Sequence, residues 1–165
     1  MSLPADPQSH IYTSRIRWTG NRGTGTSSYR AYDRSWSIET PGKPVVSCSN
    51  DPLLGGDPSL HNPEDLLLAT LSACHMLWYL HLASRAGIVV QDYSDQPEAI
   101  GEMDDAHVGR FIRATLRPHI VVPEDTDLKR ADAIHYEISK TCFIARSVNF
   151  PVLYEASYQT GASTT

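Results

Sequence analysis

Two cysteines in different predicted helices are the residues of this sequence best suited to chemistry. Cys74 lies within a long apolar segment, and Cys142 lies near the end of a second amphipathic segment, 68 residues later. A single buried cysteine is often only a small hydrophobic core residue. One cysteine on the inward face of each helix is more specific, because packed helices would bring the sulfurs together and allow a transient redox-active disulfide.

A dithiol of this kind is suited to the reduction of peroxides. One thiolate attacks the O–O bond and becomes a sulfenic acid, and a second thiol condenses with that acid to form a disulfide. The attacking cysteine needs a lowered pKa, which predicts a nearby cation. A carboxylate that pairs with the cation would hold it in place.

The remaining cysteine and the histidines suggest no metal site. The chain has three cysteines and no C-x-x-C, so a multi-disulfide secreted scaffold is excluded and a local zinc site is not expected. His75 and His81 are six residues apart, about 240° around a helix, and do not share a face. We expect no metal and no bound cofactor, and we expect Cys48 to pack in the core or stay free.

Two helices must position the cysteine pair. The first helix is predicted to begin at Pro63, with Asn62 as its cap and the acidic Glu64 and Asp65 in its first turn. Gly87 predicts where this helix stops. This spine helix, residues 63–86, would be about 36 Å long. A second helix is predicted over residues 126–146, with one apolar face made of Leu128, Ala131, Ile134, Ile138, Cys142 and Ala145.

Strands are predicted on both sides of the spine helix. The N-terminal strands fall within residues 11–48 (11–18, 29–39 and 44–48), further strands within 88–122, and a last strand over 148–158. Residues 111–122 alternate between apolar and polar, and Pro118 argues for an edge position or a bulge there. This order of elements predicts a single α+β domain over residues 1–165.

Length and charge exclude several classes of protein. The chain has 165 residues, which is too short for a (β/α)₈ barrel, and 41% of them are apolar. Its formal charge of −5 gives no net-basic surface for binding nucleic acid. Residues 66–84 carry no charge and could span a bilayer. Their Ser, Thr and His residues favour a helix buried on most sides instead. Residues 1–8 lack the pattern of a signal peptide, so we expect a cytoplasmic protein without a membrane partner.

The helix start and the cysteines together resemble a known family. Asn62-Pro63-Glu64-Asp65-Leu66-Leu67 followed by Ala73-Cys74 is similar to the N-P-E-x-L…A-C signature of the OsmC/Ohr family, the osmotically inducible and organic hydroperoxide resistance proteins. The segment Cys142–Ser147 resembles the family's second-cysteine segment. The resemblance implies an OsmC-like fold, with antiparallel sheets wrapped around two central helices in an intertwined homodimer whose active sites lie at the interface.

The resemblance also implies an activity and the residues that perform it. It implies a thiol peroxidase that reduces organic hydroperoxides in oxidative-stress defence, with Cys74 as the peroxidatic and Cys142 as the resolving cysteine. Glu64 matches the acidic residue that orients a catalytic arginine. Ten residues of helix separate Glu64 from Cys74 by about 15 Å, so an arginine or a partner chain must connect them. The implied reductant is an external dithiol, of the lipoyl type in the Ohr branch.

The arginine has three candidates. Thr19-Gly20-Asn21-Arg22 resembles the turn that precedes the arginine of the Ohr branch, so Arg22 is the first candidate. Arg30 and Arg34 are held in reserve because they alternate with Tyr32 along one strand. The position that the OsmC branch uses falls near Ser47-Cys48-Ser49, where no arginine is present.

Two other functions stay open from the sequence. The first is a non-catalytic protein of the same fold that binds a hydrophobic ligand in an apolar pocket at the dimer interface. The second is Cys-dependent hydrolysis or acyl transfer, which needs a histidine base near Cys74. His75 is adjacent in sequence, but neighbouring side chains on a helix point about 100° apart, which disfavours that chemistry.

Overall fold

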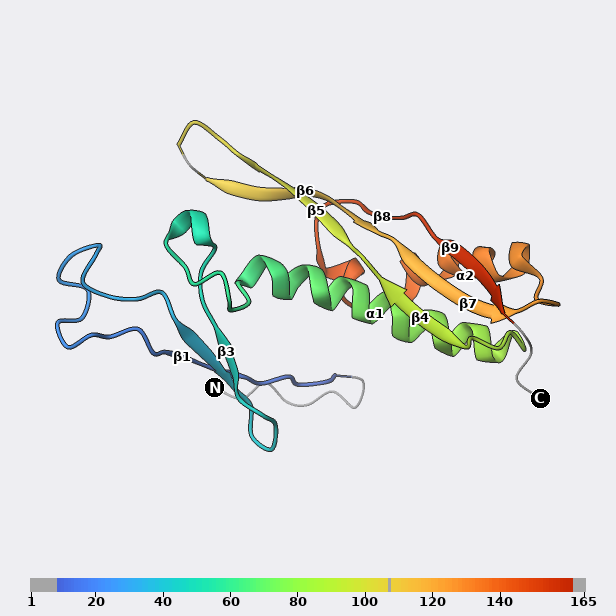
Figure 1. The fold of residues 1–165 in the computed structure, drawn as a ribbon, viewed down its shortest axis with the longest axis horizontal. Coiled ribbons are helices and arrows are strands. Elements are labelled where there is room, and N and C mark those ends of the chain that lie inside the picture. Colours follow the sequence, from blue (N-terminus) through green and yellow to red (C-terminus); the bar gives the residue numbers. More distant parts are fainter. Residues whose placement is uncertain (1–8, 107, 162–165) are drawn as a thin grey trace. The chain divides into compact units, whose positions relative to one another are not determined.

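The computed structural model describes residues 9–106 and 108–161 (Figure 1). Residues 1–8, on which the expectation of no signal peptide rests, lie outside this part. The chain divides into two compact units, residues 1–65 and 66–165. The long helix α1, Pro63–Arg85, begins in the last residues of the first unit and belongs mainly to the second.

The first unit contains one antiparallel sheet in the order β1-β2-β3. Its strands are Arg15–Trp18, Trp36–Glu39 and Val46–Cys48, shorter than the sequence predicted. The β1–β2 connection contains a turn at Asn21, whose side-chain oxygen accepts the backbone N–H groups of Gly23 and Gly25 at 2.9 and 3.0 Å. A short 3₁₀ helix, η1 (Pro52–Leu54), follows β3.

Helix α1 begins and ends where the sequence predicts. The Asn62 side chain accepts the Asp65 N–H at 2.7 Å, and the Asp65 carboxylate accepts the Asn62 N–H, which forms a reciprocal cap. After Arg85 the chain turns at Gly87, whose φ of 71° is a left-handed conformation that favours glycine. The helix therefore has fixed ends on both sides of Cys74.

The prediction that this helix is buried on most sides is wrong. Its buried side chains form one stripe with a spacing of four, because the core packs along a single face: Leu71, His75, Tyr79 and Ala83. By length and composition alone α1 could cross a bilayer, and 22% of its most apolar window is buried. One such helix is weak evidence for a membrane span, because core helices of soluble proteins pass the same test.

The second unit holds two three-stranded sheets, in the orders β4-β7-β9 and β5-β6-β8. Both are mixed, since β6 pairs with β8 and β7 with β9 in parallel. The strands are β4 Asp92–Asp95, β5 Glu98–Met103, β6 Gly109–Leu116, β7 Pro118–Pro123, β8 Val152–Tyr154 and β9 Ser157–Gly161. The antiparallel sheets implied by the resemblance are present, and two parallel strand pairs are added to them in this unit.

Two long predicted strands are each divided between the sheets. The predicted strand 111–122 breaks at Arg117, just before Pro118, because proline cannot continue the ladder of β6. The predicted strand 148–158 breaks between β8 and β9 in the same region, where the Glu155 N–H donates to the Leu116 carbonyl at 2.8 Å. The predicted strand 88–90 is a connection in the structure, and β5 was not predicted.

Helix α2, Leu128–Thr141, is shorter at both ends than the predicted helix 126–146. Asp127 caps its first turn by accepting the N–H groups of Lys129 and Arg130. It ends because Cys142 adopts an extended conformation, and a 3₁₀ turn, η2 (Ala145–Ser147), follows. Strand β4 packs against α1 in this unit, since the ring centroids of Tyr93 and Tyr79 lie 5.9 Å apart.

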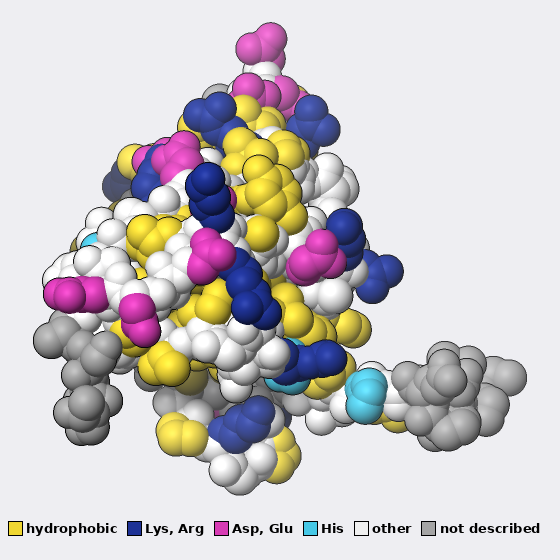
Figure 2. All heavy atoms as spheres, turned by 90° about the vertical axis from the view of Figure 1, so that its right-hand side faces the viewer, with side chains coloured by type: hydrophobic (Ala, Val, Ile, Leu, Met, Phe, Trp, Pro, Cys, Tyr) yellow, Lys and Arg dark blue, Asp and Glu magenta, His cyan; other side chains and the backbone are white. Residues whose placement is uncertain are grey.

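The core of the second unit lies where α1, α2 and β7 meet. Its fully buried side chains include Tyr79, Ile120, Val122, Ile138 and Cys142. On the face drawn in Figure 2, basic and acidic side chains are interspersed rather than gathered by sign. This face fits the absence of a basic footprint in the sequence.

Candidate functional site

The structure brings the two helix cysteines into contact. The Sγ atoms of Cys74 and Cys142 are 2.6 Å apart, and both residues are free thiols. Cys74 projects from the middle of α1 and is half-buried, while Cys142 directly follows α2 and is fully buried. Cys142 is the C-cap of α2, and its backbone N–H makes the last helical hydrogen bond, to the Ile138 carbonyl at 2.8 Å.

The two sulfurs are not equivalent. Burial, followed by the hydrogen bond to Cys74, raises the pKa of Cys142 to about 11, and the Ala145 N–H, 3.4 Å from this sulfur, opposes the shift. Cys142 therefore stays a thiol at neutral pH and donates its hydrogen to the Cys74 sulfur.

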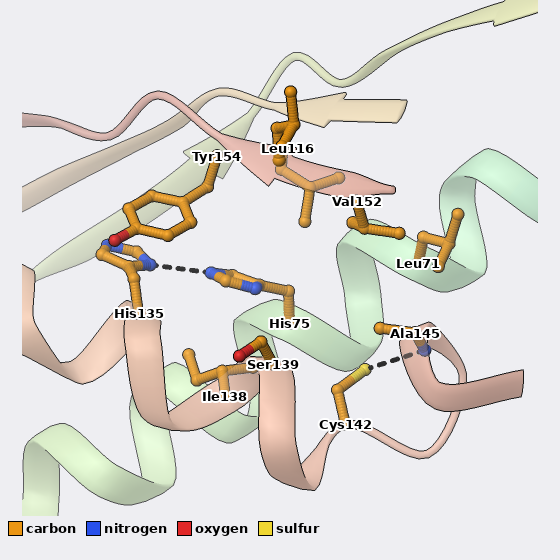
Figure 3. Close-up of a pocket in the computed structure, with 11 residues that line it drawn as sticks. Leu71, His75, Leu116, His135, Ile138, Ser139, Cys142, Ala145, Val152 and Tyr154 are labelled. Carbon is orange, nitrogen blue, oxygen red and sulfur yellow. Dashed lines mark hydrogen bonds between the residues drawn. The ribbon is translucent and has the colours of Figure 1, made fainter. Parts of the chain in front are cut away.

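A cavity of about 200 Å³ opens beside this pair (Figure 3). Its apolar wall is formed by Leu71, Leu116, Ile138, Ala145, Val152 and Leu153. Its polar groups are His75, His135, Ser139, Cys142 and Tyr154. The volume corresponds to about six or seven water molecules, so the cavity fits a small molecule rather than a drug-sized one.

Two neighbouring imidazoles, His75 and His135, point toward each other in the lining of the cavity in Figure 3. His75 Nε2 lies 2.7 Å from His135 Nδ1, and both rings are buried. His135 Nε2 lies 3.1 Å from the hydroxyl of Tyr158, which is 3.4 Å from the hydroxyl of Tyr79. Tyr79 also donates to the backbone carbonyl of Ala131 at 3.3 Å. A continuous hydrogen-bonded row thus runs from the cavity into the core.

Burial keeps both histidines uncharged. Desolvation lowers the pKa of His75 to about 4, partly opposed by Asp95. Desolvation, together with the neighbouring His75, lowers the pKa of His135 to about 3. The Asp95 carboxylate is itself held by the Ser72 hydroxyl at 2.5 Å and the Arg117 N–H at 2.7 Å. At neutral pH the cavity therefore offers neutral imidazoles.

The sequence analysis named His75 but missed His135. The available signal was position, because His135 falls between Ile134 and Ile138 on the apolar face of α2, where a histidine must find a buried partner. His81, by contrast, is exposed on α1 and contacts the edge of Trp78. Within residues 9–106 and 108–161, no group of three or more metal-ligating side chains is placed to hold a metal ion.

Glu64 and the candidate arginines belong to the first unit. Glu64 is exposed in the first turn of α1. Arg22 pairs with Asp33 at 3.6 Å and donates to the Arg30 carbonyl. Arg30 is exposed. Cys74 belongs to the second unit, so the catalytic roles of these side chains stay predictions.

Arg34 is the most constrained of the three arginines. Its guanidinium donates to the carbonyls of Tyr29 and Tyr32 at 2.8 and 3.1 Å. It also stacks over both aromatic rings, 4.1 Å from the Tyr29 centroid and 4.9 Å from that of Tyr32. This arrangement gives Arg34 a structural function in the first unit.

Cys48 packs in the core of the first unit, as expected. It is fully buried and free, and it lies at the end of β3 opposite His61. Burial raises the pKa of its thiol. Cys48 is thus an inert packing residue, and the redox-competent thiols are the other two.

The fold and the paired thiols define a small α+β protein with a dithiol beside an apolar cavity. The model of the OsmC-like protein family matches residues 56–155, which include both cysteines, and the chain belongs to this family. The uncharacterized protein YmaD of Bacillus subtilis (strain 168) is 24% identical over 158 residues, covering 92% of this chain and 97% of YmaD.

Solved structures share the fold. An OsmC-like protein of unknown function from Vibrio cholerae, VCA0330, matches with a TM-score of 0.81 and 23% identity, covering 90% of this chain and all of that one. An organic hydroperoxide resistance protein OsmC from Legionella pneumophila matches with a TM-score of 0.64 and 20% identity, over 92% of this chain and all of that one. A provisionally named organic hydroperoxide resistance protein of Vibrio cholerae, with captopril in one active site, matches with a TM-score of 0.62 and 17% identity. The match covers 93% of this chain and 95% of that one.

Proposed function

We propose that this protein is a thiol-dependent peroxidase that reduces organic hydroperoxides in oxidative-stress defence. The observation that carries the proposal is the 2.6 Å separation of the Cys74 and Cys142 sulfurs beside a small apolar cavity. The family supports it, because it includes proteins named for organic hydroperoxide resistance.

The chemistry assigns one step to each sulfur. The Cys74 thiolate attacks the terminal oxygen of ROOH, the O–O bond breaks, and RO⁻ leaves and takes a proton, giving a Cys74 sulfenic acid and ROH. The Cys142 thiol then displaces hydroxide from this sulfenic acid, so a Cys74–Cys142 disulfide and water form. An external dithiol, of the lipoyl type, reduces the disulfide by exchange.

In this proposal, an arginine and a glutamate activate Cys74. Arg22, with Arg30 or Arg34 in reserve, would stabilise the Cys74 thiolate, and Glu64 would orient that arginine. A homodimer would complete the site, since Glu64 lies ten residues before Cys74 on α1. We place the protein in the cytoplasm, with no nucleic-acid or membrane partner.

The substrate fits the cavity by size and polarity. A wall of aliphatic side chains suits the organic part of a hydroperoxide, and neutral histidines and a thiol face its oxygens. One structural neighbour holds a small organic molecule, captopril, in one of its active sites.

Turnover with a matched variant tests the proposal. Purified protein should consume an alkyl or fatty-acid hydroperoxide in the presence of a dithiol, and Cys74→Ser should abolish turnover. Cys48→Ser serves as the control, because Cys48 is a core thiol of the first unit. Failure of the wild-type protein with both classes of hydroperoxide would overturn the assignment.

A second function is favoured by the apolar wall of the cavity. In this alternative, the family fold binds a hydrophobic ligand without catalysis, and the two cysteines remain reduced. Mass spectrometry under native conditions distinguishes the two cases, because a binding protein would retain an apolar ligand and leave Cys74 unreacted after peroxide treatment.

A further inference from the structure

We propose that the external dithiol attacks the Cys74 sulfur of the disulfide, and that the backbone N–H of Ala145 stabilises the negative charge on Cys142 as that sulfur leaves. The inference rests on the proposed Cys74–Cys142 disulfide. It identifies the sulfur that the reductant attacks and a protein group that acts in the reductive exchange.

The two sulfurs differ in their access from solvent. Cys74 is half-buried on α1, whereas Cys142, at the end of α2, is 0% exposed. Thiol–disulfide exchange requires the attacking thiolate to reach one of the two bonded sulfurs. A thiol that arrives from solvent therefore reaches Cys74, and Cys142 is the sulfur that leaves.

Cys142 is a poor leaving group unless its charge is stabilised. Burial disfavours the thiolate and raises the pKa of this thiol to about 11. A disulfide opens more slowly as the pKa of the leaving thiol rises. A group that stabilises negative charge on the Cys142 sulfur therefore accelerates the reduction.

The backbone N–H of Ala145 is placed to stabilise this charge. It donates to Cys142 Sγ at 3.4 Å, and Figure 3 shows this hydrogen bond. The backbone N–H groups of Ala145 and Ile144 both oppose the rise in the pKa of Cys142. Hydrogen bonds of this kind favour the charged form of the sulfur over the neutral form. Because the sulfurs of Cys74 and Cys142 are already 2.6 Å apart, closing the disulfide moves Cys142 little from this donor.

The turn that follows α2 holds this donor in place. The Cys142 carbonyl accepts the Arg146 N–H at 3.1 Å, and the Ile144 carbonyl accepts the Ser147 N–H at 2.9 Å. The Ser147 hydroxyl also donates to the Phe143 carbonyl at 2.8 Å. Because these bonds close the turn on itself, the donor faces the sulfur before the reaction begins and needs no reorganisation.

The exchange balances in atoms and electrons. A thiolate of the dithiol attacks Cys74 Sγ and forms a mixed disulfide, the Cys74–Cys142 bond breaks, and its electron pair stays on Cys142. The Cys142 thiolate, stabilised by the Ala145 N–H, then takes the proton of the second thiol of the reductant. That second sulfur attacks the mixed disulfide, releases the Cys74 thiolate and closes the cyclic disulfide of the reductant. Both cysteines are reduced, and the dithiol is oxidised.

The site of attack is tested without peroxide. Diamide forms the Cys74–Cys142 disulfide, and 2-mercaptoethanol, a small neutral monothiol, opens it to a mixed disulfide. Early samples are quenched with acid, free thiols are blocked with N-ethylmaleimide, and mass spectrometry locates both labels. The mixed disulfide is expected on Cys74 and N-ethylmaleimide on Cys142, in at least about tenfold excess over the reverse pattern.

The hydrogen bond is tested by replacing one backbone N–H with an ester oxygen. A synthetic peptide for residues 142–165 can be ligated to the rest of the chain at Cys142, which yields the complete protein. Ala145→lactic acid removes the N–H that donates to the sulfur. The matched control is the same ester change at Arg146, which removes the N–H bonded to the Cys142 carbonyl in the same turn and leaves Ala145 intact.

The two ester proteins should differ in the rate at which 2-mercaptoethanol opens the disulfide. The ester at Ala145 should slow this step by at least about tenfold, the usual effect of losing a hydrogen bond to a charged group. The ester at Arg146 should change the rate by less than about threefold, because its N–H does not contact the sulfur. Circular dichroism compares the folding of both proteins with that of the unmodified chain.

Two results would overturn the inference. A mixed disulfide on Cys142 would show that the thiol attacks from the cavity, whose wall includes this residue. Equal rates for the two ester proteins would show that the Ala145 N–H does not act on the leaving sulfur. Since no peroxide is used, a protein that exchanges thiols as expected but fails to reduce hydroperoxides would lose the proposed activity and keep this assignment.

Discussion

The sulfur of Cys142 donates a hydrogen bond to the sulfur of Cys74 at 2.6 Å, although 68 residues separate them in the chain. Cys74 lies on α1, and Cys142 is the C-cap residue of α2. The φ of −63° at Cys142 and the bond from its N–H to the Ile138 carbonyl are those of a helix, so its side chain stays on the apolar face that the sequence predicted.

Removal of the resolving thiol should trap the first intermediate. In Cys142→Ser, the Cys74 sulfenic acid has no partner thiol and should persist after peroxide addition. A dimedone-type reagent followed by mass spectrometry should then label Cys74 nearly completely, against little labelling in the wild type. Equal labelling of the two proteins would contradict the role of Cys142.

The three arginines should differ in effect. If Arg22 stabilises the Cys74 thiolate, Arg22→Ala should slow the alkylation of Cys74 at neutral pH and slow sulfenic acid formation about tenfold. Arg34→Ala should mainly reduce stability, by about 1 kcal/mol, because it loses its stacking on Tyr29 and Tyr32. Iodoacetamide kinetics against pH measures the first effect, and Arg85→Ala is the control. If the pH dependence of alkylation is unchanged in Arg22→Ala, Arg30 becomes the candidate for stabilising the Cys74 thiolate.

The buried histidines should make stability depend on pH. The pKa of His75 is lowered to about 4 and that of His135 to about 3, below the unfolded value of 6.5, so the unfolded state binds more protons between these limits. The free energy of unfolding should be highest above pH 6.5 and should decrease as the pH drops toward 3. His75 alone corresponds to about 2–3 kcal/mol.

Urea unfolding at pH 7 and pH 4.5 measures this dependence. His135→Phe should flatten the slope, because it removes one of the two groups that must charge on unfolding, whereas His81→Ala should keep it. A wild-type protein equally stable at both pH values would show that the pair is not held neutral.

Core substitutions should confirm where the second unit is packed. Ile120→Ala on β7 removes a fully buried side chain between the helices and should cost about 3 kcal/mol. Val89→Ala, at a position 60% exposed, should change stability by less than about 0.5 kcal/mol. Chemical denaturation measures the free energy of unfolding of both variants. A similarly small decrease in both would show that the core lies elsewhere.

The sequence predicted the parts of the fold that local signals control. The cap at Asn62, the stop at Gly87 and the apolar positions Ala114, Leu116, Ile120 and Val122 all appear as expected, because capping and periodicity act over a few residues. The division of 111–122 and 148–158 between two sheets was not predicted, because strand exchange between sheets is decided by long-range pairing.

The same distinction applies to the site. The proximity of the cysteines followed from two helices with one inward cysteine each. The pairing of His75 with His135 did not, because neither helix indicates which of its buried residues meets the other, and a lone histidine on an apolar face is ambiguous. Glu64 and Arg22 were named by resemblance, and Arg30 and Arg34 by their alternation along a predicted strand.

One measurement tests the central claim most directly. Reduced protein is treated with one equivalent of an organic hydroperoxide, quenched by alkylation and digested without reduction, and its peptides are examined by mass spectrometry. The account predicts a Cys74–Cys142 disulfide with Cys48 still a thiol. A protein that keeps all three thiols, or that forms a disulfide through Cys48, would contradict it.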